Sequence, residues 1–136
     1  MRIFLDTNVL ASALATRGLC ADILRQVIAS HTIVVSEPLL IELRRVLTKK
    51  FKVPASLSKD ITDFFSPDVI EWDASEVLDV SIKDRDDVVI LSSAYHGGAE
   101  LFVTGDKEIL GLSQIKGMKI VSPREFWNTK RREKKA

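Results

Sequence analysis

The chain has 136 residues, of which 46% are hydrophobic and 29% are charged, and its formal net charge is +1. This length fits one domain, and this composition excludes a disordered chain. No apolar run approaches the ~18 residues of a membrane span, and an acid at position 6 comes too early for a signal peptide. The only cysteine, Cys20, excludes an internal disulfide and fits a cytoplasmic protein. With two histidines, any enzymatic chemistry must come mainly from carboxylates.

The charge is unevenly distributed along the chain. Residues 130–136 hold five bases and one acid, so they carry +4 and the rest of the chain carries −3. We expect one domain over residues 1–129, followed by a basic, disordered tail over residues 130–136. Weak contact with phosphates is the functional alternative for such a tail.

The first half of the chain alternates between strand and helix patterns. In chain order we expect a buried strand at residues 2–5 and a helix at 9–14 that is capped by Thr7 or Asn8 and ends at a break at Gly18. A helix at 21–29 and a strand at 32–35 follow. We then expect a helix that is capped by Ser36 and has Leu39, Leu43 and Leu47 on its apolar face, a break at 51–54 and a short helix at 56–65.

The second half continues this alternation. We expect a weak strand at residues 69–72 and an ambiguous segment at 75–82, for which a helix is favoured. An apolar helix at 88–95 should end at Gly97-Gly98. Strands at 101–103 and 118–121 and a closing helix at 123–128 complete the chain. Strands that alternate with helices need crossover connections. The fold class is therefore α/β, with a mainly parallel central sheet and helices on both faces.

Two predicted core strands end in an aspartate. Asp6 follows the first strand directly, and Asp106 follows the strand at 101–103 after Thr104-Gly105. Ligands of open parallel sheets bind beyond the carboxyl ends of the strands, so both aspartates are candidate site residues. An aspartate just after a strand is also a common turn or cap residue, but two such ends in one small sheet favour a site.

Further acids lie on two predicted helices. Asp84, Asp86 and Asp87 precede the apolar helix, where acids also complement the helix dipole, and the local pattern leaves the choice between Asp84 and Asp87 open. Glu42 lies on the flank of an apolar stripe, and a salt bridge to Arg45 is the simpler explanation for it. Four converging carboxylates would repel one another without a cation, and Mg²⁺ or Mn²⁺ is the ion that suits them.

Four segments resemble the motifs of one known family. Asp6-Thr7-Asn8 with its flanking apolar residues is similar to the opening motif of PIN domains, the PilT N-terminus family. The segments at residues 36–43, 84–98 and 101–107 resemble the second, third and last acidic motifs of that family, in the same order. The resemblance covers roughly residues 1–126, and it implies a PIN-like three-layer α/β/α sandwich.

The resemblance also implies a set of site residues. The acids of the family fall on Asp6, Glu42, Asp87 and Asp106, of which Asp6, Asp87 and Asp106 would hold the metal. Supporting positions are Asn8, Thr104 and Asp84. The basic residues after Glu42 are candidates for one wall of an RNA-binding groove, with Arg44, Arg45 and Lys49 foremost and Lys50 and Lys52 beside them.

The activity that the resemblance implies is that of an endoribonuclease dependent on Mg²⁺ or Mn²⁺, most like the VapC-type toxin of a toxin–antitoxin pair. An antitoxin protein and a second copy of the chain are the partners that it implies. A non-catalytic PIN-like module that binds RNA or protein is the alternative. A haloacid-dehalogenase-like phosphatase is disfavoured, because its second acid would occupy the position of Asn8.

Overall fold

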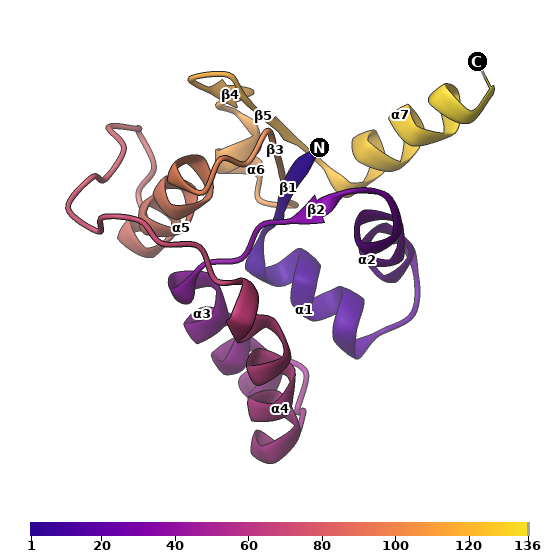
Figure 1. Cartoon of the computed structure of the whole chain (residues 1–136), viewed down its shortest axis with the longest axis vertical. Helices are drawn as coiled ribbons and strands as arrows, with labels where there is room; N and C mark the ends of the chain where they lie inside the picture. The colour runs from indigo at the N-terminus through magenta and orange to yellow at the C-terminus, as the bar shows by residue number, and fades with distance from the viewer. Residues whose placement is uncertain (136) are drawn as a thin grey trace.

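The computed structural model describes the backbone of residues 1–135 and the side chains of residues 1–129. Its strands are β1 (Arg2–Leu5), β2 (Thr32–Ile33), β3 (Leu101–Val103), β4 (Gln114–Ile115) and β5 (Met118–Val121) (Figure 1). Its helices are α1 (Thr7–Ala15), α2 (Leu19–Ser30), α3 (Glu37–Lys49), α4 (Ala55–Phe65), α5 (Arg85–His96), α6 (Lys107–Leu110) and α7 (Pro123–Lys135), with a 3₁₀ turn, η1, at Ser66–Asp68. No helix in the described part of the chain is long and apolar enough to span a bilayer.

The strands form one five-stranded sheet in the order β2-β1-β3-β5-β4. β1 pairs in parallel with β2 and β3, β3 pairs in parallel with β5, and the short β4 runs antiparallel to β5. In Figure 1 the sheet lies between α5 on one side and α1 with α2 on the other. The predicted α/β/α sandwich with a mainly parallel central sheet is therefore confirmed.

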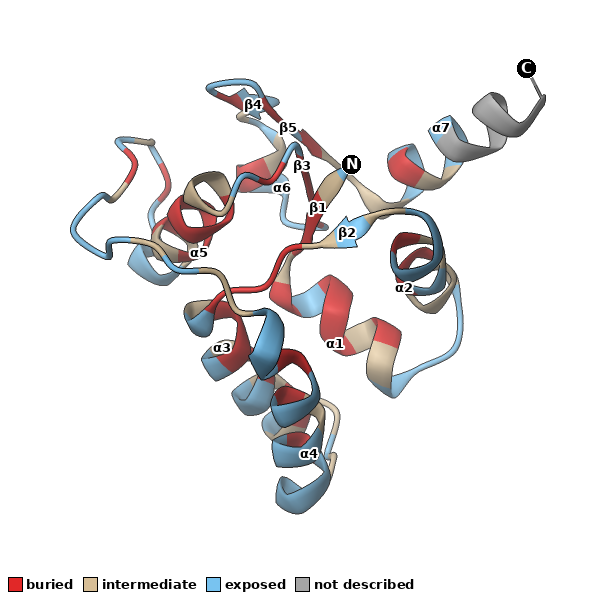
Figure 2. Ribbon diagram, viewed as in Figure 1, coloured by how far each residue is buried: buried red, intermediate tan, exposed pale blue. Residues whose placement is uncertain are grey.

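The core is centred on the pairing of β1 with β3. Phe4 and Phe102 are opposite each other in the register, and their fully buried rings stack with centroids 5.2 Å apart. Burying a side chain of this kind stabilises the fold by about 1.5–3 kcal/mol. Figure 2 shows the central strands in red and the outer surface of α4 in pale blue. Because β1 and β3 are held in register, the residues that follow them lie at the same edge of the sheet.

Two buried serines fix the start of α3 against α5. The predicted cap residue Ser36 accepts a hydrogen bond from the backbone N–H of Leu39 at 3.4 Å. It also accepts one from the hydroxyl of Ser93 on α5 at 2.7 Å, and neither serine is exposed. Water cannot readily replace these bonds, so α3 and α5 keep a fixed relative position.

Two local predictions are wrong. The cap of the first helix is Asp6 rather than Thr7 or Asn8, because the Asp6 carboxylate accepts from the Thr7 N–H. The segment at residues 75–82, for which the sequence favours a helix, has no regular secondary structure. Its Leu78 and Ile82 are buried, and the Leu78 N–H donates to the hydroxyl of Ser92 on α5. Packing against α5 has overridden the local preference for a helix.

Several element boundaries also differ from the prediction. β2 ends at Ile33, and in place of the predicted strand at residues 69–72 there is a single bridge between Val35 and Val69. α6, β4 and η1 were not predicted. α5 ends as expected, because Gly98 adopts the left-handed φ of +79°. The backbone of α7 continues past residue 128, and the predicted disordered tail at residues 130–136 falls where no side chain is described.

Candidate functional site

Asp6 lies at the end of β1, at the edge of the sheet. Its backbone N–H donates to the carbonyl oxygen of Val103 at 2.9 Å, so the pairing of β1 with β3 holds its backbone. Its Oδ1 accepts from the Thr7 N–H at 2.8 Å, and its Oδ2 accepts from the Thr104 hydroxyl at 2.7 Å. Burial raises the pKa of Asp6, while the two hydrogen bonds oppose that rise and the charge of Asp106 adds to it. The carboxylate is therefore held in one orientation.

Thr104 connects Asp6 to Asp106. Its side chain is fully buried, and its hydroxyl donates to Asp6 and accepts from the backbone N–H of Asp106 at 3.0 Å. Oδ1 of Asp106 accepts from the N–H groups of Glu108 and Ile109 at 2.8 and 3.1 Å, and so caps α6. Asp106 is thus both a helix cap and a neighbour of Asp6. Its role as a cap therefore does not exclude a role in the site.

Asp87 is electrostatically coupled to every other acid of the predicted site. Its pKa is raised to about 7, mainly by burial and then by the charges of Asp84, Asp6, Asp106 and Glu42, in that order. Coupling of this kind requires carboxylates that lie close together in a region of low dielectric. The tertiary structure therefore brings together acids from the ends of β1 and β3, from α3 and from the first turn of α5.

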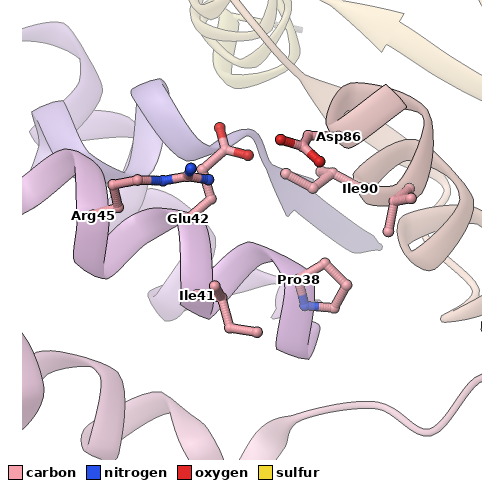
Figure 3. Close-up of a pocket in the computed structure, with 7 residues that line it drawn as sticks. Pro38, Ile41, Glu42, Arg45, Asp86 and Ile90 are labelled. Atoms are coloured by element: carbon pink, nitrogen blue, oxygen red, sulfur yellow. The ribbon is translucent and has the colours of Figure 1, made fainter. Parts of the chain in front are cut away.

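The neighbours of Asp87 on α5 have other surroundings. Asp84 is exposed, and it caps α5 by accepting from the Asp86 N–H at 2.8 Å. Asp86 is also exposed, and it lies opposite Glu42 in a pocket of about 220 Å³ between α3 and α5 (Figure 3). These placements favour Asp87 over Asp84 as the third acid of the site.

Glu42 lies between the inner acids and this pocket. It is half-buried, and its pKa is raised first by burial and then by the charge of Asp6. The charge of Arg45 and the hydroxyl of Thr7 act in the opposite direction. In Figure 3 the Glu42 carboxylate points toward Asp86, and Arg45 extends beside it from the same helix.

The fit of a metal ion follows from the chemistry of these groups. Within residues 1–129, no three acids, histidines or cysteines are arranged to hold an ion as they stand. Carboxylates without a cation repel one another, so a somewhat open cluster is expected. All the side-chain donors are carboxylate oxygens, which suit Mg²⁺ or Mn²⁺. The donor set fits such an ion, provided that the side chains close in around it.

The predicted basic residues lie on different sides of α3. The guanidinium of Arg44 donates to the Thr62 hydroxyl at 2.7 Å, on the side that faces α4. Arg45 and Lys49 instead line a pocket of about 330 Å³ that also contains Lys50, Glu42, Asp84 and Asp86. Asn8 is exposed, and its side-chain oxygen accepts from the Lys50 ammonium at 3.4 Å. The structure therefore places Arg45 and Lys49 beside the acids, and it does not place Arg44 there.

Sequence reasoning missed two features of the site. It did not foresee that Asp86 would face Glu42, although Asp86 lies one helical turn before the core residue Ile90. It considered Thr7 only as a possible helix cap, whereas the Thr7 hydroxyl is buried beside the acids. Neither feature has a local signal, because each depends on how α1, α3 and α5 pack.

Comparison with known proteins identifies the family. The sequence profile of the PIN domain matches residues 2–108, and the chain therefore belongs to the PIN domain family. The chain is similar to a solved structure of VapBC2 from Rickettsia felis, bound to a DNA fragment from their promoter, with a TM-score of 0.60 and 21% identity. That match covers 90% of this chain and 98% of the other, and at this identity it shows the fold. No curated protein matches the chain.

Proposed function

We propose that this PIN-domain protein is a metal-dependent endoribonuclease and the toxin of a toxin–antitoxin pair. The observation that carries the proposal is the coupling of Asp87 to Asp6, Asp106 and Glu42 at the carboxyl edge of the parallel strands. Ligands of such sheets bind at this edge. A cluster of carboxylates held there by the backbone is suited to phosphodiester hydrolysis assisted by a divalent ion.

The four acids divide two tasks in this proposal, holding the ion and orienting the attacking water. Asp6, Asp87 and Asp106 would hold Mg²⁺ or Mn²⁺, and Glu42 would hold the ion or orient the attacking water. When bound, the ion supplies an activated water, orients the phosphodiester and stabilises charge on the leaving oxygen. Thr104 keeps the Asp6 carboxylate oriented through its hydrogen bond. Cleavage is expected to leave a 3′-hydroxyl and a 5′-phosphate.

The basic residues beside the acids would contact RNA phosphates. Arg45 and Lys49 line the pocket next to Glu42, so they are the residues of α3 that we assign to this task. Asn8 has a supporting role, because it holds the Lys50 ammonium at the same side of the site. Arg44 is bonded to Thr62 and is not assigned to RNA.

The proposed protein partners are an antitoxin and a second copy of the chain. One chain of the solved structure of VapBC2 from Rickettsia felis is similar to this chain in fold, which supports the antitoxin. Ile41 on α3 and Leu57 and Phe64 on α4 are exposed, and they offer apolar surface for a protein partner. A homodimer rests on the family resemblance.

A non-catalytic binding module is the second candidate function. The observation in its favour is that no three acids among residues 1–129 form a ready metal site. Such a module would keep the fold and the acidic edge but would not respond to divalent ions.

Purified protein and end-labelled RNA separate the two functions. We expect cleavage with Mg²⁺ or Mn²⁺ and none with EDTA, and we expect Asp6→Asn to abolish it and Asp106→Asn nearly to do so. Asp79→Asn is the matched control, since Asp79 is an exposed acid outside the predicted site. Mg²⁺ should also raise the Tm of the natural protein and raise that of Asp6→Asn much less. If divalent ions shift neither protein and no RNA is cut, the binding module is the better assignment.

A further inference from the structure

Thr7 is a buried polar residue that the proposed site does not yet use. It is the first residue of α1, directly after Asp6, and its side chain is 1% exposed. Its Oγ1 makes no hydrogen bond with any described atom. A buried hydroxyl without a partner is destabilising, and it is uncommon in folded proteins unless a ligand or a moving group completes it.

The carboxylate of Glu42 is the candidate hydrogen-bond acceptor for this hydroxyl. α1 packs against α3, which carries Glu42. The Thr7 hydroxyl is close enough to lower the pKa of Glu42, although the two do not reach hydrogen-bond geometry. In Figure 3 the carboxylate is turned toward Asp86, at the pocket between α3 and α5. For a hydrogen bond to form, the Glu42 carboxylate would have to turn away from Asp86 and toward the Thr7 hydroxyl.

We propose that Thr7 is a positioning residue for Glu42, whose carboxylate turns inward to accept a hydrogen bond from the Thr7 hydroxyl. This movement accounts for two separate observations, the hydroxyl without a partner and the open arrangement of the acids. It places Glu42 nearer to Asp6, whose backbone is adjacent to that of Thr7. The hydrogen bond itself does not depend on the proposed nuclease activity, whereas its consequence for RNA cleavage does.

A double-mutant cycle without metal tests the hydrogen bond directly. The unfolding equilibrium constants of Thr7→Val, Glu42→Met and the double variant are measured in urea at pH 8 with EDTA. Valine keeps the shape of threonine, and methionine keeps the approximate length of glutamate without an oxygen. We expect the two substitutions to be non-additive by about fivefold in the unfolding constant. Thr7→Ser, which keeps the hydroxyl, should retain the coupling to Glu42.

Ser58 supplies the matched control for this cycle. Its hydroxyl is also buried and without a partner among the described atoms, but it lies on α4. Ser58→Ala and Glu42→Met should be additive. Additivity of Thr7→Val with Glu42→Met would overturn the proposal. If Thr7→Val does not fold, Thr7→Ala takes its place in the same cycle with the same criterion.

Cleavage kinetics then test the consequence of the contact. Thr7→Val should lower kcat by about 10–100-fold with little change in KM for RNA, as expected for a residue that orients a site group. Thr7→Ser should keep kcat close to that of the natural protein. In a protein that already carries Glu42→Gln, adding Thr7→Val should lower kcat no further. An equal loss in both backgrounds would show that Thr7 acts independently of Glu42 and would refute its positioning role. If the natural protein cuts no RNA, the nuclease proposal fails, while the metal-free cycle still decides the role of Thr7.

Discussion

Replacing Asp87 with asparagine should stabilise the protein in the absence of metal. Folding raises the pKa of this carboxyl from 3.8 to about 7, through burial and the charges of four other acids. Between those pH values the folded state holds a proton that the unfolded state releases. Stability must therefore fall as the pH rises through this window, and above it the folded protein carries the full cost of the charge. Asparagine has a similar shape and no charge, so it removes that cost.

The size of the effect follows from the two pKa values. Their difference corresponds to about 4 kcal/mol if the charge is fully effective. Asp87 is only half-buried, and water screens the repulsion from its neighbours. We therefore expect Asp87→Asn to gain about 1–2 kcal/mol at pH 8, which corresponds to a rise in Tm of roughly 3–8 °C for a chain of this size.

Thermal unfolding in EDTA at pH 8 and at pH 4.5 measures this gain. It should be largest at pH 8 and clearly smaller at pH 4.5, because that pH lies near the lower end of the window between the two pKa values, where the folded protein holds the proton and part of the unfolded chains hold it too. Asp79→Asn is the matched control, because Asp79 is an exposed acid outside the predicted site. If Asp87→Asn is no more stable than the natural protein at pH 8, or gains equally at both pH values, Asp87 does not lie in the acidic cluster.

Other expectations follow from the same structure. Thr104→Val should lower RNA cleavage by about 10–100-fold while Thr104→Ser keeps most of it, because the hydroxyl orients Asp6; equal activity of the two variants would contradict this role. Lys49→Ala should reduce the salt dependence of RNA binding by about one unit of slope, whereas Arg44→Ala should not, and filter binding over a range of salt concentrations distinguishes them. Truncation after Thr129 should leave the Tm nearly unchanged, because residues 130–136 contain no large apolar side chain, and a fall of many degrees in calorimetry would show that the segment docks.

The sequence alone predicted much of the fold. The apolar residues at 2–5 and 101–103 predicted buried strands, and Ser36 predicted the start of α3, because these signals are local in the chain. The position of Asp6 and Asp106 at one edge also followed from the sequence, since parallel strands align their carboxyl ends. The segment at residues 75–82 was missed, because its conformation is set by contacts with α5 rather than by its own residues.

The selection among neighbouring candidates needed the tertiary structure. Asp84, Asp86 and Asp87 lie within one turn of a helix, where consecutive side chains point about 100° apart. Which of them meets Asp6 and Asp106 therefore depends on how α5 is rotated against the sheet. The same reason separates Arg44, which reaches α4, from Arg45, which lies beside Glu42. The sequence specified the residues on each helix, but only the packing of α1, α3 and α5 set their orientation, because that rotation is fixed by contacts between residues far apart in the chain.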